Sequence, residues 1–150
     1  MTDLLAIARV AEAQRVRLGL EWLPGMLVRT GAHSLRVVTT LADGRHLLAW
    51  TTWDGSEQDI PVAYSSDEMG SAVPDLSDTL TRLGLLEWVR QVYGPLVYTR
   101  CMAHSEPDRD PWWYVFAPSA SEPSEWRWRR ASPTELEALV AVLVAAPDPT

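Results

Sequence analysis

Apolar residues recur every three or four positions in two long stretches of the chain, and this spacing predicts two helices. The first stretch covers residues 3–18, with a threonine and an aspartate before it as capping groups and Gly19 as its end. The second covers residues 77–93 and stops at Gly94, which a proline follows. Both keep their charged residues off the apolar side, as helices on a globular core do.

A third helix is predicted near the C-terminus by a start signal and a long apolar run. Residues 132–135 read Ser-Pro-Thr-Glu, a capping box headed by Ser132 with proline at the first helical position. Residues 138–146 contain no polar side chain, so this helix is apolar on every side and must be buried on more than one. It packs either inside the domain or against another chain, and we expect a homodimer through it.

The clearest strand signal is a β-hairpin in the first half of the chain. Residues 35–41 and 45–53 are rich in β-branched and aliphatic side chains, and Asp43-Gly44 between them is typical of a two-residue turn with positive φ at both positions. This turn predicts a register in which one face of both strands is buried. The expected pairs are Leu41 with His46, Thr39 with Leu48, and Val37 with Trp50.

Further short strands surround the hairpin, and residues 65–74 are polar and loop-like. The strand candidates are residues 26–30, 60–64, 96–102, 112–116 and 125–130. Runs of strands joined by short turns indicate antiparallel pairing. The expected fold class is therefore α+β, with an antiparallel sheet of about five or six strands and N-terminal, middle and C-terminal helices. All 150 residues are expected to form a single domain.

Composition narrows the setting in which the protein works. The formal net charge is −7, which repels phosphate backbones and disfavours non-specific nucleic-acid binding. A single cysteine excludes an internal disulfide and favours a reducing compartment. No apolar run is long enough to span a membrane, and residues 1–5 lack the features of a signal peptide. We therefore expect a cytoplasmic protein with no membrane partner.

Acidic residues are concentrated in one part of the chain. Between His46 and Arg82 there is no basic residue. An acidic patch here would suit a basic protein partner, whereas the alternative is a solvated acidic face without a partner. The candidate partner-binding acids are Asp54, Glu57, Asp59, Asp67 and Glu68.

Tryptophan and arginine are interleaved near the C-terminal third of the chain. Such residues stack on ligands or anchor protein partners. The alternative for Trp126 and Trp128 is a pair of core side chains covered by arginine stems. Adjacent Trp112 and Trp113 cannot both face inward on a strand. The candidate partner-binding residues in this region are Trp112, Trp113, Arg127 and Arg129.

Cys101 and His104 form a Cys-x-x-His segment, which is half of a possible zinc site. No second pair of ligands at matching spacing is present, so we expect neither a metal nor another cofactor. A Cys-His nucleophile pair would need a third, orienting group. No residue is therefore assigned a catalytic role.

The second and last helices resemble those of small proteins from phages and prophages of high-GC bacteria. In these proteins one helix opens Pro-Asp-Leu-Ser/Thr-Asp and closes on an aromatic residue and glycine, and the last helix ends Ala-Ala-Pro. The matching positions of the middle helix are Pro74, Asp75, Leu76, Ser77, Asp78, Thr81, Leu85, Leu86, Val89, Arg90, Tyr93 and Gly94. Those of the last helix are residues 134–141 and 145–147. The chain departs from the pattern at Thr79, where proline is usual, and at Gly84, which is displaced by one position.

This resemblance covers roughly the second half of the chain, leaves out the hairpin and the tryptophan-rich strands, and implies a phage-type origin. It supplies no catalytic residue. The sequence therefore predicts a non-enzymatic accessory protein that binds a macromolecular partner, most simply a protein such as a host factor that it inhibits. The alternative is a small-molecule-binding domain with an aromatic-lined pocket, with weak hydrolase chemistry at Cys101 and His104.

Overall fold

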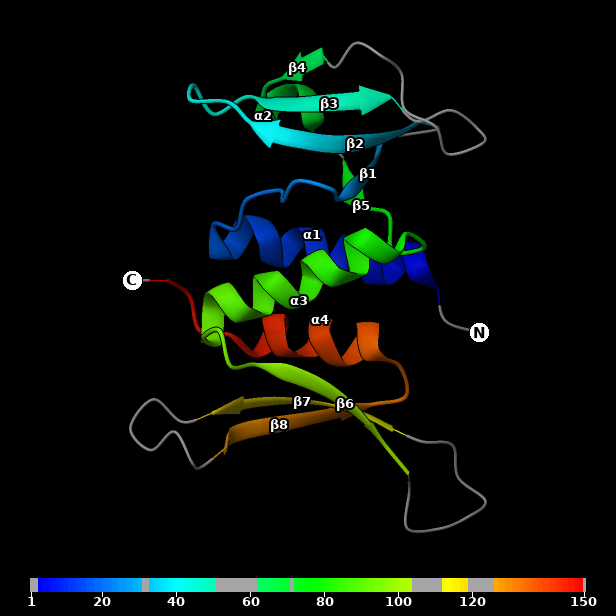
Figure 1. Cartoon of the computed structure of the whole chain (residues 1–150), viewed down its shortest axis with the longest axis vertical. Coiled ribbons are helices and arrows are strands. Elements are labelled where there is room, and N and C mark those ends of the chain that lie inside the picture. Colours follow the sequence, from blue (N-terminus) through cyan, green and yellow to red (C-terminus); the bar gives the residue numbers. More distant parts are fainter. Residues whose placement is uncertain are drawn as a thin grey trace. The chain divides into compact units, whose positions relative to one another are not determined.

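The computed structural model describes residues 3–30, 33–50, 62–70, 72–103, 112–118 and 126–149, with the side chains of residues 33, 50, 66–67, 118 and 126–131 outside that description. The chain divides into two compact units, Met1–Gly84 and Leu85–Thr150, and one helix, α3, crosses the boundary between them (Figure 1). Each unit contains its own antiparallel sheet.

The N-terminal unit pairs a five-stranded sheet with helices. The strand order is β4-β3-β2-β1-β5, and every neighbouring pair is antiparallel. Its elements are α1 (Leu4–Leu18), β1 (Leu27–Thr30), β2 (His33–Thr40), β3 (His46–Trp50), β4 (Val62–Tyr64), α2 (Ser66–Met69), β5 (Val73–Pro74) and the start of α3 (Thr79–Tyr93). Residues 65–74 were expected to be a loop, and that prediction is wrong, because they contain α2 and β5.

The first helix ends where its sequence signals predict. The Asp3 carboxylate accepts hydrogen bonds from the backbone N–H groups of Leu5 and Ala6, which have no partner inside the helix. Gly19 adopts a φ of 66°, the left-handed conformation that ends many helices. The N-terminal helix is therefore confirmed, and it packs against β5.

The hairpin exists, but its register differs from the predicted one. Leu41 and Arg45 are joined by a backbone hydrogen bond of 2.7 Å, so the loop has three residues, with Gly44 at a φ of 85° and Asp43 outside the positive-φ region. An irregularity after Val37 shifts the pairing again. The observed pairs are Leu35 with Trp50, Val37 with Leu48, Thr39 with Leu47, and Thr40 with His46.

A buried polar network ties the start of α3 to β1 and β2. The Thr81 hydroxyl, fully buried, accepts a 2.7 Å hydrogen bond from the N–H of Leu27 and donates a 2.9 Å bond to Asp78. Asp78 also receives the Arg36 guanidinium at 3.0 Å. Burial alone would raise the pKa of Asp78, but the hydrogen bonds from Arg36 and Thr81 outweigh it and lower that pKa below its ordinary value. Asp78 is thus both the cap of α3 and its link to the sheet.

The C-terminal unit places a helix against a three-stranded antiparallel sheet of order β6-β7-β8. Its elements are β6 (Tyr98–Met102), β7 (Trp112–Pro118), β8 (Trp126–Ser132), α4 (Glu135–Ala145) and the end of α3. In Figure 1, α4 runs along one face of this sheet, and it contacts β7 and β8. The Tyr93 hydroxyl of α3 donates a hydrogen bond to the Val142 carbonyl of α4.

The last helix begins two residues later than predicted. Ser132 pairs with Trp113 in the sheet and does not cap α4; the Thr134 hydroxyl accepts the N–H of Glu137 instead. Most of the apolar run is buried within the single chain, through Ala138, Leu139, Val140, Val142 and Leu143, whereas Val144 is exposed. Packing inside the chain, the first of the two expected alternatives, accounts for this burial. The apolar run of α4 therefore no longer supports a homodimer, which stays a prediction.

The α+β class with N-terminal, middle and C-terminal helices is confirmed. Among the described residues the strands number eight and are divided between the two sheets. The single domain stays a prediction.

Candidate binding face

Strands β6 and β7 pair so that aromatic residues gather on one side of their sheet. Successive side chains of a strand point to opposite faces, and directly paired residues share a face. Tyr98 pairs with Phe116, and Met102 pairs with Trp112, so these four lie on the same face. We call this the outer aromatic face. Its described members are Tyr98, Arg100, Met102, Trp112, Tyr114 and Phe116.

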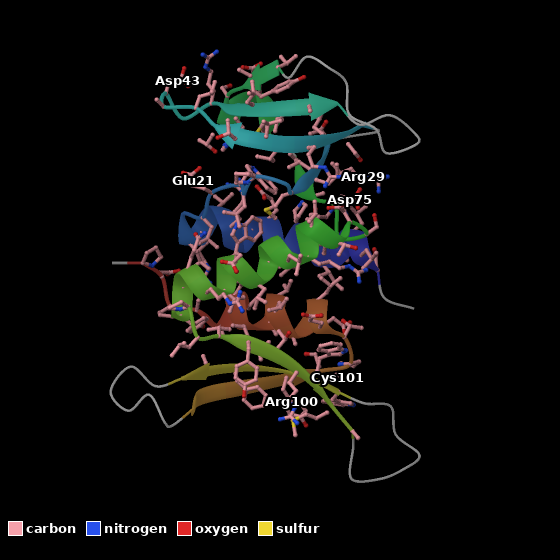
Figure 2. All side chains as sticks on the ribbon, in the orientation of Figure 1. Glu21, Arg29, Asp43, Asp75, Arg100 and Cys101 are labelled. Carbon is pink, nitrogen blue, oxygen red and sulfur yellow. The ribbon has the colours of Figure 1, made fainter. Side chains whose placement is uncertain are left out.

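The opposite face of the sheet is covered by α4. Val115 and Ala117 of β7 are fully buried there, and the Thr99 hydroxyl of β6 donates a 2.9 Å hydrogen bond to Glu135 of α4. Because α4 lies on this side, the outer aromatic face lies on the side of the sheet turned away from the helix. Figure 2 shows Arg100 on that side of β6.

Neighbouring rings on the outer aromatic face contact one another. The ring centroids of Tyr98 and Phe116 lie 5.1 Å apart, and those of Tyr114 and Phe116 lie 6.1 Å apart, with both pairs stacked. Such ring contacts hold side chains in one arrangement before a ligand arrives. Tyr98, Tyr114 and Phe116 are therefore arranged before binding, so binding would order little in this part of the face.

The outer aromatic face remains accessible despite its apolar character. The exposed fractions of Tyr98, Met102 and Trp112 are 36%, 37% and 37%, and Arg100 is exposed as well. Trp, Tyr, Met and Arg are the residue types enriched at protein interfaces, where aromatic and arginine side chains carry most of the binding energy. Among the described residues of this face there is no carboxylate, and the charged residue described on it is Arg100. These features suit a partner with an apolar centre and an acidic rim.

The two tryptophans predicted from the sequence separate onto different faces. Trp112 is exposed on the outer aromatic face, whereas Trp113 is partly buried on the opposite face and pairs with Cys101. The prediction that they cannot both face inward is confirmed. The backbone of Arg129 pairs with Phe116, and Arg127 lies in β8, but the side chains of both lie outside the described residues.

The predicted acidic surface is mostly outside the described part of the chain. This is so for Asp54, Glu57 and Asp59, and for the side chain of Asp67. Glu68 is described and has a local structural contact. Its carboxylate accepts the N–H of Ser65, whose hydroxyl accepts the N–H of Glu68, so the two residues form a capping box at the start of α2.

Cys101 is an exposed free thiol on β6, and His104 lies outside the described residues. In the described ranges no cluster of three or more histidine, cysteine or acidic side chains is placed to hold a metal ion. This arrangement tests neither the zinc half-site nor the nucleophile pair, and the expectation that the chain has no metal ligands and no catalytic residue stays a prediction.

Sequence reasoning missed most of the outer aromatic face. Tyr98, Tyr114 and Phe116 belong to it together with Trp112, but of these four only Trp112 was predicted from the sequence as a binding residue. Period-two alternation within residues 96–102 and 112–116 would have grouped them by strand. The register that joins the two strands was the missing information.

Comparison with known proteins finds no matching family model, no matching curated protein and no matching solved structure. No helix among the described residues has the length and apolar character needed to cross a membrane.

Proposed function

We propose that this chain is a non-enzymatic accessory protein of phage type that acts by binding a protein partner through its outer aromatic face. The observation that carries the proposal is the set of half-exposed aromatic and methionine side chains on the uncovered side of β6 and β7. Leaving such side chains accessible to water has a free-energy cost, which an interface removes.

A protein partner is favoured over a nucleic acid by the charge balance. Aromatic side chains on an open sheet can also stack on bases, but binding of that kind needs positive charge along the backbone path. The chain carries a net charge of −7, and Arg100 is the cation described on this face. An inhibitor of a host protein is one form that this binding would take.

The phage-type origin rests on the resemblance of residues 74–94 and 134–147 to phage proteins. A cytoplasmic site of action is part of the proposal, since Cys101 is an exposed free thiol that an oxidising compartment would modify. A second copy of this chain is a further partner to be tested, because a homodimer would now have to form through a surface other than the apolar face of α4.

The test compares capture of host proteins by three immobilised forms of the full chain. These are the wild type, the double variant Tyr98→Ser/Trp112→Ser, and the control Val144→Ser, which alters an exposed apolar residue of α4. Proteins retained from a bacterial lysate are identified by mass spectrometry. We expect at least one protein to be retained by the wild type and by the control and to be lost from the double variant.

Retention of the same proteins by all three forms would contradict the proposal. It would also be contradicted if the wild type retained nucleic acid and treatment with nuclease removed the retained material. Sedimentation of the wild type across the micromolar range tests the homodimer. If a dimer forms and the double variant abolishes it, the face serves self-association and the host-partner proposal is wrong.

A further inference from the structure

A groove in the N-terminal unit carries two arginine residues on its walls and has a volume of about 590 Å³. One wall is α1, where Leu5, Arg9 and Glu12 share a face of the helix. The other includes Arg29 of β1 and Val73 of β5, which are directly paired. None of the described lining residues is aromatic, so this groove is not the aromatic-lined pocket expected from the sequence.

The size and composition of the groove suit a small molecule. Ligand sites in proteins have volumes of roughly 300–1,000 Å³, with apolar walls and a few polar groups that fix orientation. Leu5, Ala13 and Val73 supply apolar wall here. A smaller cavity of about 120 Å³ adjoins it and shares Leu5, Arg29 and Val73.

Arg9 and Arg29 differ from the other arginines of this unit. Within the described part of the chain, neither of their guanidinium groups has a hydrogen-bond or ion-pair partner. Arg36 and Arg45, by contrast, are paired with Asp78 and Asp43 respectively. Two unpaired guanidinium groups on one groove are notable in a chain of net charge −7.

The one carboxylate of the larger groove is already neutralised. Both oxygens of Glu12 accept hydrogen bonds from the Arg15 guanidinium, at 2.6 and 2.8 Å, and Arg15 also lies over the ring of Trp22. The charges of Arg9 and Arg29 are therefore left for a ligand. Asp75 lines the smaller cavity and would repel an anion there, which places the anionic group at the Arg9 end.

We propose that this groove binds a small organic oxyanion. Its carboxylate or phosphate group is held by Arg9 and Arg29, and its apolar part lies against Leu5, Ala13 and Val73. Arginine forms paired hydrogen bonds with both kinds of oxyanion, so the chemistry of the anionic group is common to the two. The proposal is independent of the outer aromatic face, which belongs to the other unit.

Titration of the full-length protein with four probes tests this site. The probes are octanoate, monooctyl phosphate, octanol and inorganic phosphate, followed through backbone amide chemical shifts. We expect at least one of the two octyl anions to bind about tenfold or more tightly than octanol or inorganic phosphate. Only an octyl anion can contact both the arginine side chains and the apolar side chains of the groove. Its shifts are expected at Gly70, Ala72 and Val73, and raising the salt concentration should weaken its binding.

Arg9→Gln and Arg29→Gln should each weaken that binding about fivefold or more. Arg45→Gln, which alters an exposed arginine of the hairpin that does not line the groove, should leave the binding unchanged. The proposal is wrong if neither octyl anion binds the wild type, if octanol binds equally well, or if the shifts lie elsewhere. All three of these outcomes are measured on the wild type, so they do not depend on whether the variants fold.

Discussion

Replacing Thr81 with valine should destabilise the N-terminal unit although valine has nearly the same shape. Thr81 has no exposed surface, and its hydroxyl oxygen accepts the N–H of Leu27 at 2.7 Å. The same hydroxyl donates to the Asp78 carboxylate at 2.9 Å. Thr81→Val removes both bonds and adds no cavity, so it isolates the energetic role of the oxygen atom.

The magnitude follows from the groups left behind. A buried backbone N–H without a partner costs about 1–3 kcal/mol. Asp78 keeps its bonds from Arg36 and from the Thr81 N–H, so losing the third bond adds only about 1 kcal/mol. The expected loss is therefore roughly 2–4 kcal/mol, which for a chain of this size lowers the Tm by about 4–16 °C.

Urea denaturation followed by circular dichroism, with calorimetry for the Tm, measures this loss. Thr81→Ser keeps the hydroxyl and should lose only about 1 kcal/mol through the missing methyl group. Thr79→Val, at an exposed position of the same helix, should stay within about 0.5 kcal/mol of the wild type. If Thr81→Val is as stable as Thr79→Val, the network does not stabilise the fold and the reasoning fails.

Three further changes test other parts of the fold by the same measurements. Gly84→Ala should lower stability by roughly 0.5–2 kcal/mol despite the better helix propensity of alanine, because the new Cβ would lie 2.9 Å from the buried side chain of Met26; a more stable variant would contradict the packing. Burial lowers the pKa of His46 below its ordinary value of 6.5, so as the pH falls the imidazole is protonated in the unfolded chain before it is protonated in the folded one. The wild type therefore loses stability as the pH falls below 6.5. The unfolding free energy of His46→Gln should fall less between pH 7 and 5, and an unchanged slope would refute this. Because the folded pKa of Asp78 is lowered, its carboxylate stabilises the fold at pH values above 3.8, the ordinary pKa, and this contribution is lost as the pH falls through the lower folded pKa. Asp78→Asn should therefore be less stable than the wild type at pH 7, and the difference in unfolding free energy should narrow below pH 3.8. A difference that does not change with pH would contradict this explanation.

The helices could be predicted from the sequence because their signals are local. Capping residues and periodic apolar positions located α1 and α3 to within about two residues. The start of α4 was misplaced because both Ser132 and Thr134 can cap a helix. Ser132 pairs with Trp113 in the sheet as part of β8, so Thr134 is the cap of α4. The Ser-x-x-Glu signal at Ser65 was present for α2 as well, in a segment interpreted as a loop.

The sheets were less predictable because their register depends on partners. One residue more in the hairpin loop moved every predicted pair between β2 and β3. The candidate site depends on pairing in the same way. Trp112 could be selected from the sequence, but its grouping with Tyr98 depends on how the consecutive strands β6 and β7 align.

The binding isotherm of the captured partner with the wild type and with Tyr98→Ser/Trp112→Ser tests the central claim most directly. Each of these aromatic side chains should contribute about 2 kcal/mol or more if it lies in the centre of the interface, so each serine should raise the Kd about 30-fold or more. The control Val144→Ser should bind like the wild type. An unchanged Kd for the folded double variant would contradict the assignment of the outer aromatic face as the binding surface.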